Sequence, residues 1–240
     1  KNRSSKVTEN HMKYKFVFVL ALLAVTIIIA NGCGSSSGTG RYTIPSEIIG
    51  GGDSGTVTGT GTGTGTQTDV EALLSSGWSD FGYGAYSSAI NKFNEATLNA
   101  NITAGQLADA NNGLGWALTK ANGIAAGQGY FAKAADLKDE AKLGLAAAYI
   151  QSGDYNNAKN YLVLLGLSDT SFSLTTPHAV GVSNAEAHAM LALAYFMTGD
   201  KSGAIDQMKC ATANDLSSDS SVKQIRATLL SLDPTLANSI

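Results

Sequence analysis

The pattern of apolar and polar residues divides the 240-residue chain into three parts. Apolar residues run almost unbroken from Phe16 to Ala30, interrupted only by Thr26. Glycine, serine and threonine dominate the next part, from Gly34 to Thr68. From Asp69 onward the pattern is helical, without the strict alternation that is typical of β-strands. The pattern therefore predicts an N-terminal apolar segment, a linker and an all-α domain over residues 69–240.

Capping boxes mark three helix starts in the third part: Thr68 with Glu71, Thr103 with Gln106, and Ser183 with Glu186. In this motif the first side chain accepts a hydrogen bond from the backbone N–H three residues later. The later side chain accepts one from the first residue's own N–H. Each box therefore predicts the beginning of a helix.

Three segments of the third part share one pattern, over residues 73–96, 142–165 and 188–211. Each has a small residue in its expected first helix: Gly77, Ala146 and Ala192. Seven residues later each has a glycine that can end the helix, and five further on each has an alanine. A fourth segment, 110–123, matches only in its first helix, where Gly115 is the small residue. Because small residues let antiparallel helices approach closely, the pattern predicts repeated helical hairpins.

This arrangement of small residue, glycine and alanine resembles the tetratricopeptide repeat (TPR) family over roughly residues 70–213. The resemblance implies an all-α solenoid of about four irregular hairpins, whose first helices line a concave groove. Two segments depart from the family pattern: a glycine-interrupted second helix at 123–137 and an insertion at 166–183. A last apolar helical face, over residues 220–232, predicts a helix that caps the array.

The register of the family places six side chains near the groove: Trp78, Phe81, Asn112, Trp116, Lys120 and Phe196. Aromatic anchors flanked by polar groups are what peptide recognition uses. The alternative is that both tryptophans fill the core between repeats. The insertion, which contains Phe172, either folds over the groove as a lid or forms a disordered loop.

The apolar segment near the N-terminus has the layout of a secretory signal. Lys13 and Lys15 precede it, small residues follow it, and a helix over Phe16–Ala30 would rise only about 22 Å. The ending "ANGC" resembles a bacterial lipobox, which implies cleavage before Cys33 and attachment of a lipid to that cysteine. Residues 1–32 are then the upstream segment and signal, and 33–68 a flexible linker. The alternative is an uncleaved membrane anchor. Residues 1–11 precede Met12, the expected start, and do not enter the fold prediction.

Charge limits the partners of the processed chain. Five of the 16 basic residues and one of the 19 acidic residues lie before Cys33, which leaves 11 basic and 18 acidic residues and a formal charge of −7. This acidic balance argues against a nucleic-acid partner, so the membrane contact would come from the lipid. Cys210 alone remains after Cys33, so neither an internal disulfide nor a cysteine-rich metal site is expected.

Catalytic motifs are missing from the expected helical domain, residues 69–240, which contains no HExxH, GxSxG or Walker lysine motif. His178 and His188 lie ten residues apart without nearby cysteines, and we interpret them as a loop and a helix histidine, not as a metal pair. We therefore expect no enzyme activity, no cofactor, no metal and no small-molecule substrate.

The resulting expectation is an adaptor that binds a peptide or partner protein in the bacterial cell envelope. Gly34, not aspartate, follows Cys33, which favours the outer membrane by resemblance to known lipoproteins. The alternative is a surface lipoprotein that captures carbohydrate through exposed aromatic residues.

Overall fold

The computed structural model describes residues 69–214 and 220–240. The expected signal segment, the lipidation site Cys33 and the expected linker at 33–68 lie outside these residues. The described part is all-α and ends in a short 3₁₀ helix, η1. Its elements are α2 (Val70–Gly82), α3 (Tyr86–Thr97), α4 (Ala104–Asn122), α5 (Ile124–Ala134), α6 (Asp139–Ser152), α7 (Tyr155–Leu164), α8 (Asn184–Met197), α9 (Lys201–Asn214), α10 (Ser220–Leu232) and η1 (Pro234–Asn238).

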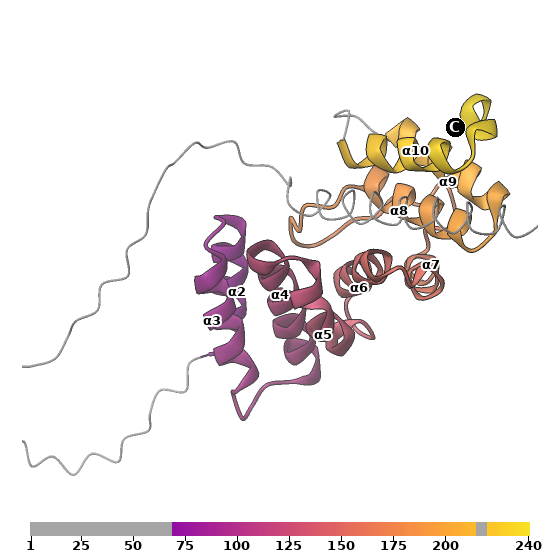
Figure 1. Ribbon diagram of the computed structural model, residues 1–240. Coiled ribbons are helices and arrows are strands. Elements are labelled where there is room, and N and C mark those ends of the chain that lie inside the picture. Colours follow the sequence, from indigo (N-terminus) through magenta and orange to yellow (C-terminus); the bar gives the residue numbers. More distant parts are fainter. Residues whose placement is uncertain (1–68, 215–219) are drawn as a thin grey trace, which may run out of the picture.

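The helices pack as a series of hairpins (Figure 1). The pairs are α2 with α3, α4 with α5, α6 with α7 and α8 with α9, and a short connection makes each pair antiparallel. The first helices α2, α4, α6 and α8 also contact one another in succession, and we call this layer the inner face. α10 packs against α8 and α9 at the end of the series. The prediction of an all-α helical repeat with a C-terminal capping helix is confirmed.

The helix starts follow the capping boxes with one correction. Thr103 caps α4 and Ser183 caps α8, where the Glu186 N–H donates to the Ser183 hydroxyl at 3.1 Å. α2 instead begins at Val70, and its cap is Asp69, whose carboxylate accepts from the Glu71 N–H at 3.0 Å. An aspartate satisfies a free N–H at a helix start as well as a threonine does, so the residue next to the predicted cap can take its place.

Aromatic rings of the second helices fill notches made by glycines of the first helices. Phe93 of α3 is fully buried against Gly77 of α2, where an added Cβ would lie 2.7 Å from its ring. Phe131 of α5 repeats this arrangement between Gly115 of α4 and Gly144 of α6, with a distance of 2.5 Å at both glycines. Phe93 also faces Gly113 of α4, so each ring joins its own hairpin to a neighbouring helix. The small residues of the repeat pattern therefore serve ring packing as well as helix approach.

The glycine-interrupted segment of the second hairpin forms a continuous helix of 11 residues, α5. Gly123 alone joins it to α4, with φ at 91°, in the left-handed region that favours glycine. This minimal connection holds α5 close along α4. The glycines of this segment therefore do not interrupt helix α5.

The C-terminal end is fastened to the last hairpin by polar contacts. Lys201 of α9 contacts the Asp233 carboxylate at 2.7 Å and the Thr235 hydroxyl at 2.8 Å. The Lys201 contact, followed by hydrogen bonds from Thr235, lowers the pKa of Asp233 from 3.8 to about 2. α10 is joined to α8 by the Ser221 hydroxyl, which donates to Glu186 at 2.7 Å. Across residues 69–214 and 220–240, every helix is too short or too polar to cross a bilayer.

Candidate functional site

The six side chains predicted for the groove do not share one exposed surface. Trp78, Lys120 and Phe196 are half-buried. Phe81, Asn112 and Trp116 are buried, with 5%, 0% and 0% of their surface exposed. The expectation that these three line an open groove is therefore corrected.

Trp116 is in the core because the neighbouring helix α5 covers it. Its ring packs edge-on against Phe131, with 5.0 Å between the ring centroids. The alternative considered for the tryptophans, that they fill the core between helices, holds for Trp116, whereas Trp78 packs against the core and is only partly buried. Lys120, one turn after Trp116, lies at the margin of this core, and burial lowers the pKa of its amine while the charge of Glu186 opposes that shift.

The ring of Trp78, in α2, presents one flat face as a binding surface on the inner face. Its indole N–H donates to the Asp109 carboxylate of α4 at 3.2 Å, which fixes the plane of the ring. One edge packs against Phe93, with 5.1 Å between centroids. On the Trp78 face lies the ring of His178, stacked in parallel with 3.6 Å between centroids and 7° between planes. His178 belongs to the 166–183 insertion, so a distant segment occupies this site.

Glu140, in the first turn of α6, holds the same histidine. Its side chain is buried, and both of its carboxylate oxygens face His178. Oε1 accepts the backbone N–H of His178 at 2.7 Å, and Oε2 lies 2.8 Å from the ring Nδ1. Oε2 also accepts a hydrogen bond from the side-chain amide of Asn112 at 2.7 Å. A buried carboxylate is stable only when it is partnered in this way.

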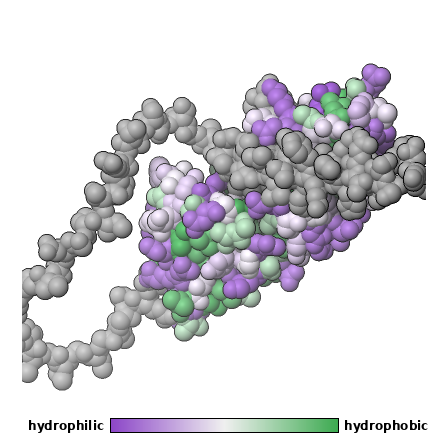
Figure 2. All heavy atoms as spheres, viewed as in Figure 1, coloured by the Kyte–Doolittle hydropathy of each residue, from purple (hydrophilic) through white to green (hydrophobic). Residues whose placement is uncertain are grey.

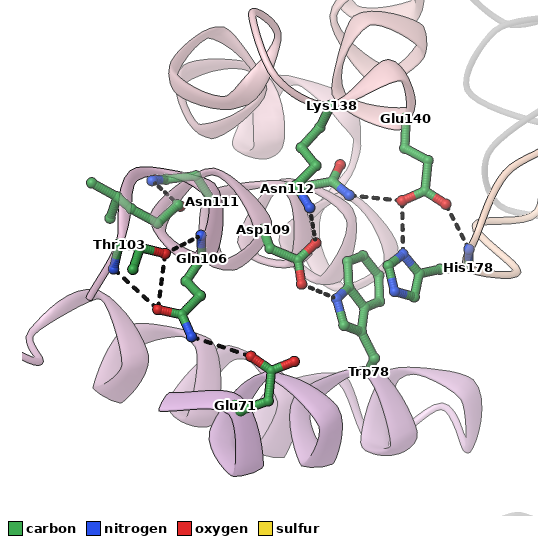
Figure 3. A network of polar contacts seen from close by, with 11 residues as sticks. Glu71, Trp78, Thr103, Gln106, Asp109, Asn111, Asn112, Lys138, Glu140 and His178 are labelled. Carbon is green, nitrogen blue, oxygen red and sulfur yellow. Dashed lines mark hydrogen bonds and ion pairs between the residues drawn. The ribbon is translucent and has the colours of Figure 1, made fainter. Parts of the chain in front are cut away.

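These residues form one polar network, shown in Figure 3. The second oxygen of Asp109 pairs with Lys138, just before α6, at 2.9 Å, and the stack of Trp78 on His178 connects this pair to the contacts of Glu140. We call Trp78, Asp109, Asn112 and Glu140 the inner-face cluster, which is occupied by His178. It joins the first three hairpins to the insertion.

The insertion is ordered and pinned at several points. Backbone oxygens near its start accept hydrogen bonds from α9: Leu167 from Gln207 at 2.8 Å and Thr170 from the Cys210 thiol at 3.1 Å. The ring of buried His188 lies 3.1 Å from the carbonyl of Phe172. The later part of the insertion reaches the inner-face cluster through His178. Of the two interpretations of this segment, the structure favours the lid over the disordered loop.

The two histidines of the described part of the chain, His178 and His188, therefore have separate partners. His188 contacts Gln207 at 2.6 Å and Phe172, while His178 contacts Glu140 and Trp78. Within the described ranges no group of three or more His, Cys, Asp and Glu side chains is placed to hold a metal ion.

Asp109, Glu140 and the stacking role of His178 were not predicted from the sequence. Glu140 had one signal: it is the acidic residue that opens the most apolar stretch of α6, and a carboxylate at such a position needs a specific partner. That partner is 38 residues away, beyond the reach of local pattern.

Apolar side chains outside the cluster are interspersed with polar ones on the face seen in Figure 2. Leu98, Leu137 and Leu164 are 84%, 61% and 68% exposed, and they lie where α3, α5 and α7 end. They form no polar contacts that would define a ligand. The inner-face cluster is therefore the better-defined site.

Comparison with known proteins gives no family. A scan of protein-family models finds no match to the chain, and a search of curated proteins finds no significant match.

Proposed function

We propose that the chain is a protein-interaction module that binds a segment of a partner protein on its inner face. One observation carries the proposal: the inner-face cluster already holds a non-helical segment of the chain itself. The cluster contacts a backbone N–H and a side chain of that segment together. Contact with backbone and side chain at once is how peptide-recognition sites work.

The cluster is also built for recognition more than for stability alone. Trp78 comes from α2, Asp109 and Asn112 from α4, and Glu140 from α6. Taking a carboxylate and an indole N–H out of water on three separate helices is costly, and apolar residues would hold the helices together as well. The hydrogen-bonded geometry instead selects what lies on the face of Trp78.

The wider setting of the module is part of the same proposal. The repeat pattern supports a TPR-like adaptor, and the "ANGC" ending supports a lipid on Cys33. A linker at 33–68 would span roughly 30–35 Å and hold the helical domain clear of an outer membrane. Tethering raises the effective concentration of the module near envelope partners.

Carbohydrate capture is the second candidate function, and one observation favours it. An aromatic platform beside carboxylates and an amide, as Trp78 lies beside Asp109, Glu140 and Asn112, is also suited to stacking on a sugar ring. It ranks second because the present occupant is a planar ring with a backbone N–H donor, both features of a peptide.

Selection from a displayed random peptide library tests the proposal. The full chain in detergent should enrich peptides, and their affinity should fall at least about tenfold for Trp78→Leu, because aromatic anchors dominate such interfaces. Tyr83→Ala, at a residue 87% exposed one turn further along, is the matched control and should bind as the wild type does.

Circular dichroism of both variants verifies that the helices remain. Enriched peptides that bind Trp78→Leu and the wild type equally would contradict the inner-face proposal. Binding of glycans on an array, lost in Trp78→Leu and without any peptide enrichment, would replace it with carbohydrate capture.

A further inference from the structure

The place occupied by His178 has the shape of a site for a planar cation. One wall is the face of Trp78, parallel to the bound ring within 7°. At the edge of the bound ring lies the Glu140 carboxylate. Its Oε1 accepts the backbone N–H of His178, and its Oε2 lies beside the ring Nδ1. A single flat group with two N–H donors at its edge would satisfy both oxygens at once.

Charge favours a cationic occupant. In the described part of the chain, His178 is the residue that forms the ion pair with Glu140, while Lys138 is paired with Asp109. The carboxylate of Glu140 is thus matched by a full positive charge only when the histidine is protonated. The buried oxygen Oδ1 of Asn112, beside Glu140, has no hydrogen-bond partner among the described residues, so one more acceptor is unfilled.

We infer that this place, between Trp78 and Glu140, is the binding site for the guanidinium group of an arginine in the partner segment. The inference rests on the proposed function and specifies its ligand. A guanidinium stacks on an indole face and presents parallel N–H donors to a carboxylate in a bidentate pair. A lysine ammonium is a point charge and lacks the plane that Trp78 would cover.

His178 is then the resident occupant, and the insertion competes with the partner. The apparent dissociation constant of the partner is raised by the reciprocal of the fraction of molecules in which His178 is out of the site. His178 is suited to leaving, because 27% of its side chain is exposed whereas that of Glu140 is 4% exposed. An arginine segment that displaces it also frees the later part of the insertion.

The test uses the full 240-residue chain in detergent and the probe acetyl-Gly-Ser-Arg-Ser-Gly-amide, with citrulline and lysine twins. Titrations follow the indole N–H resonance of Trp78. His178→Ala should bind the arginine peptide at least about tenfold more tightly than the wild type, because the competitor is gone. His178→Ala combined with Glu140→Gln should lose that gain, and citrulline and lysine twins should bind His178→Ala at least about tenfold more weakly than arginine.

Equal binding of the arginine and citrulline peptides by His178→Ala would overturn the inference, as would affinity that does not depend on Glu140. If His178→Ala loses its helical circular dichroism signal, the wild type is titrated instead. Excess arginine peptide should then shift the His178 ring resonances. A citrulline peptide that shifts them equally would overturn the inference. Library peptides that need Trp78 but contain no arginine would also overturn it and leave the proposed function intact. Absence of any Trp78-dependent peptide would remove both.

Discussion

Replacing Phe131 with alanine should lower the free energy of unfolding by about 3–5 kcal/mol. The ring is fully buried, and glycines of α4, α5 and α6 surround it: Gly115, Gly127 and Gly144. Glycines have no side chains that could move into the space left by the ring, so much of the cavity would persist. Urea denaturation of Phe131→Ala and the wild type, followed by far-UV circular dichroism, measures the difference.

Tyr83→Ala is the control for this experiment, since an 87% exposed aromatic residue should change stability by less than about 0.5 kcal/mol. A loss below about 1 kcal/mol in Phe131→Ala would mean that the ring does not join the second hairpin to α6. The glycine notches would then not be what fixes the packing of successive hairpins.

Replacing Glu140 with alanine should cost about 1–3 kcal/mol and loosen the insertion. The change leaves the buried amide of Asn112 and the backbone N–H of His178 without their acceptor. Hydrogen exchange should therefore become faster at the later part of the 166–183 insertion, while the helical cores of α4 and α8 stay protected. Mass spectrometry of exchanged peptides, with urea denaturation beside it, gives both quantities.

Asp139→Ala provides the comparison, because Asp139 is the adjacent residue of the same helical turn. Its side chain is 68% exposed and pairs with Lys142, an interaction worth little at a surface. If the two variants show equal stability and equal exchange in the insertion, Glu140 does not anchor that segment.

The fold was predictable from sequence because its signals are local. The capping boxes at Thr103 and Ser183 act over three residues, and the spacing from Gly77 to Gly84 describes one helix and its turn. Such patterns identify helices and hairpins without knowledge of distant contacts. Asp69 in place of Thr68 is the kind of boundary difference that adjacent capping residues leave open.

The candidate site was only partly predictable, and the two tryptophans show why. Trp78 and Trp116 both follow the small residue of a first helix, so the register gives them the same place. Phe131 of α5 packs against Trp116 within a closely joined hairpin, whereas a face of Trp78 is left for His178. That difference depends on the turn at Gly123 and on a loop residue a hundred positions away, and neither is encoded in the helical period.

The position of His178 in solution tests the central claim most directly, namely that the inner face is a binding surface with an occupant. Proton NMR of the wild-type chain should show the ring protons of His178 upfield of their values in the unfolded chain, because they lie over the indole of Trp78. In Trp78→Leu the same resonances should return toward the unfolded values. Unshifted His178 resonances that do not respond to Trp78→Leu would contradict the account, since the insertion would then not occupy the inner-face cluster.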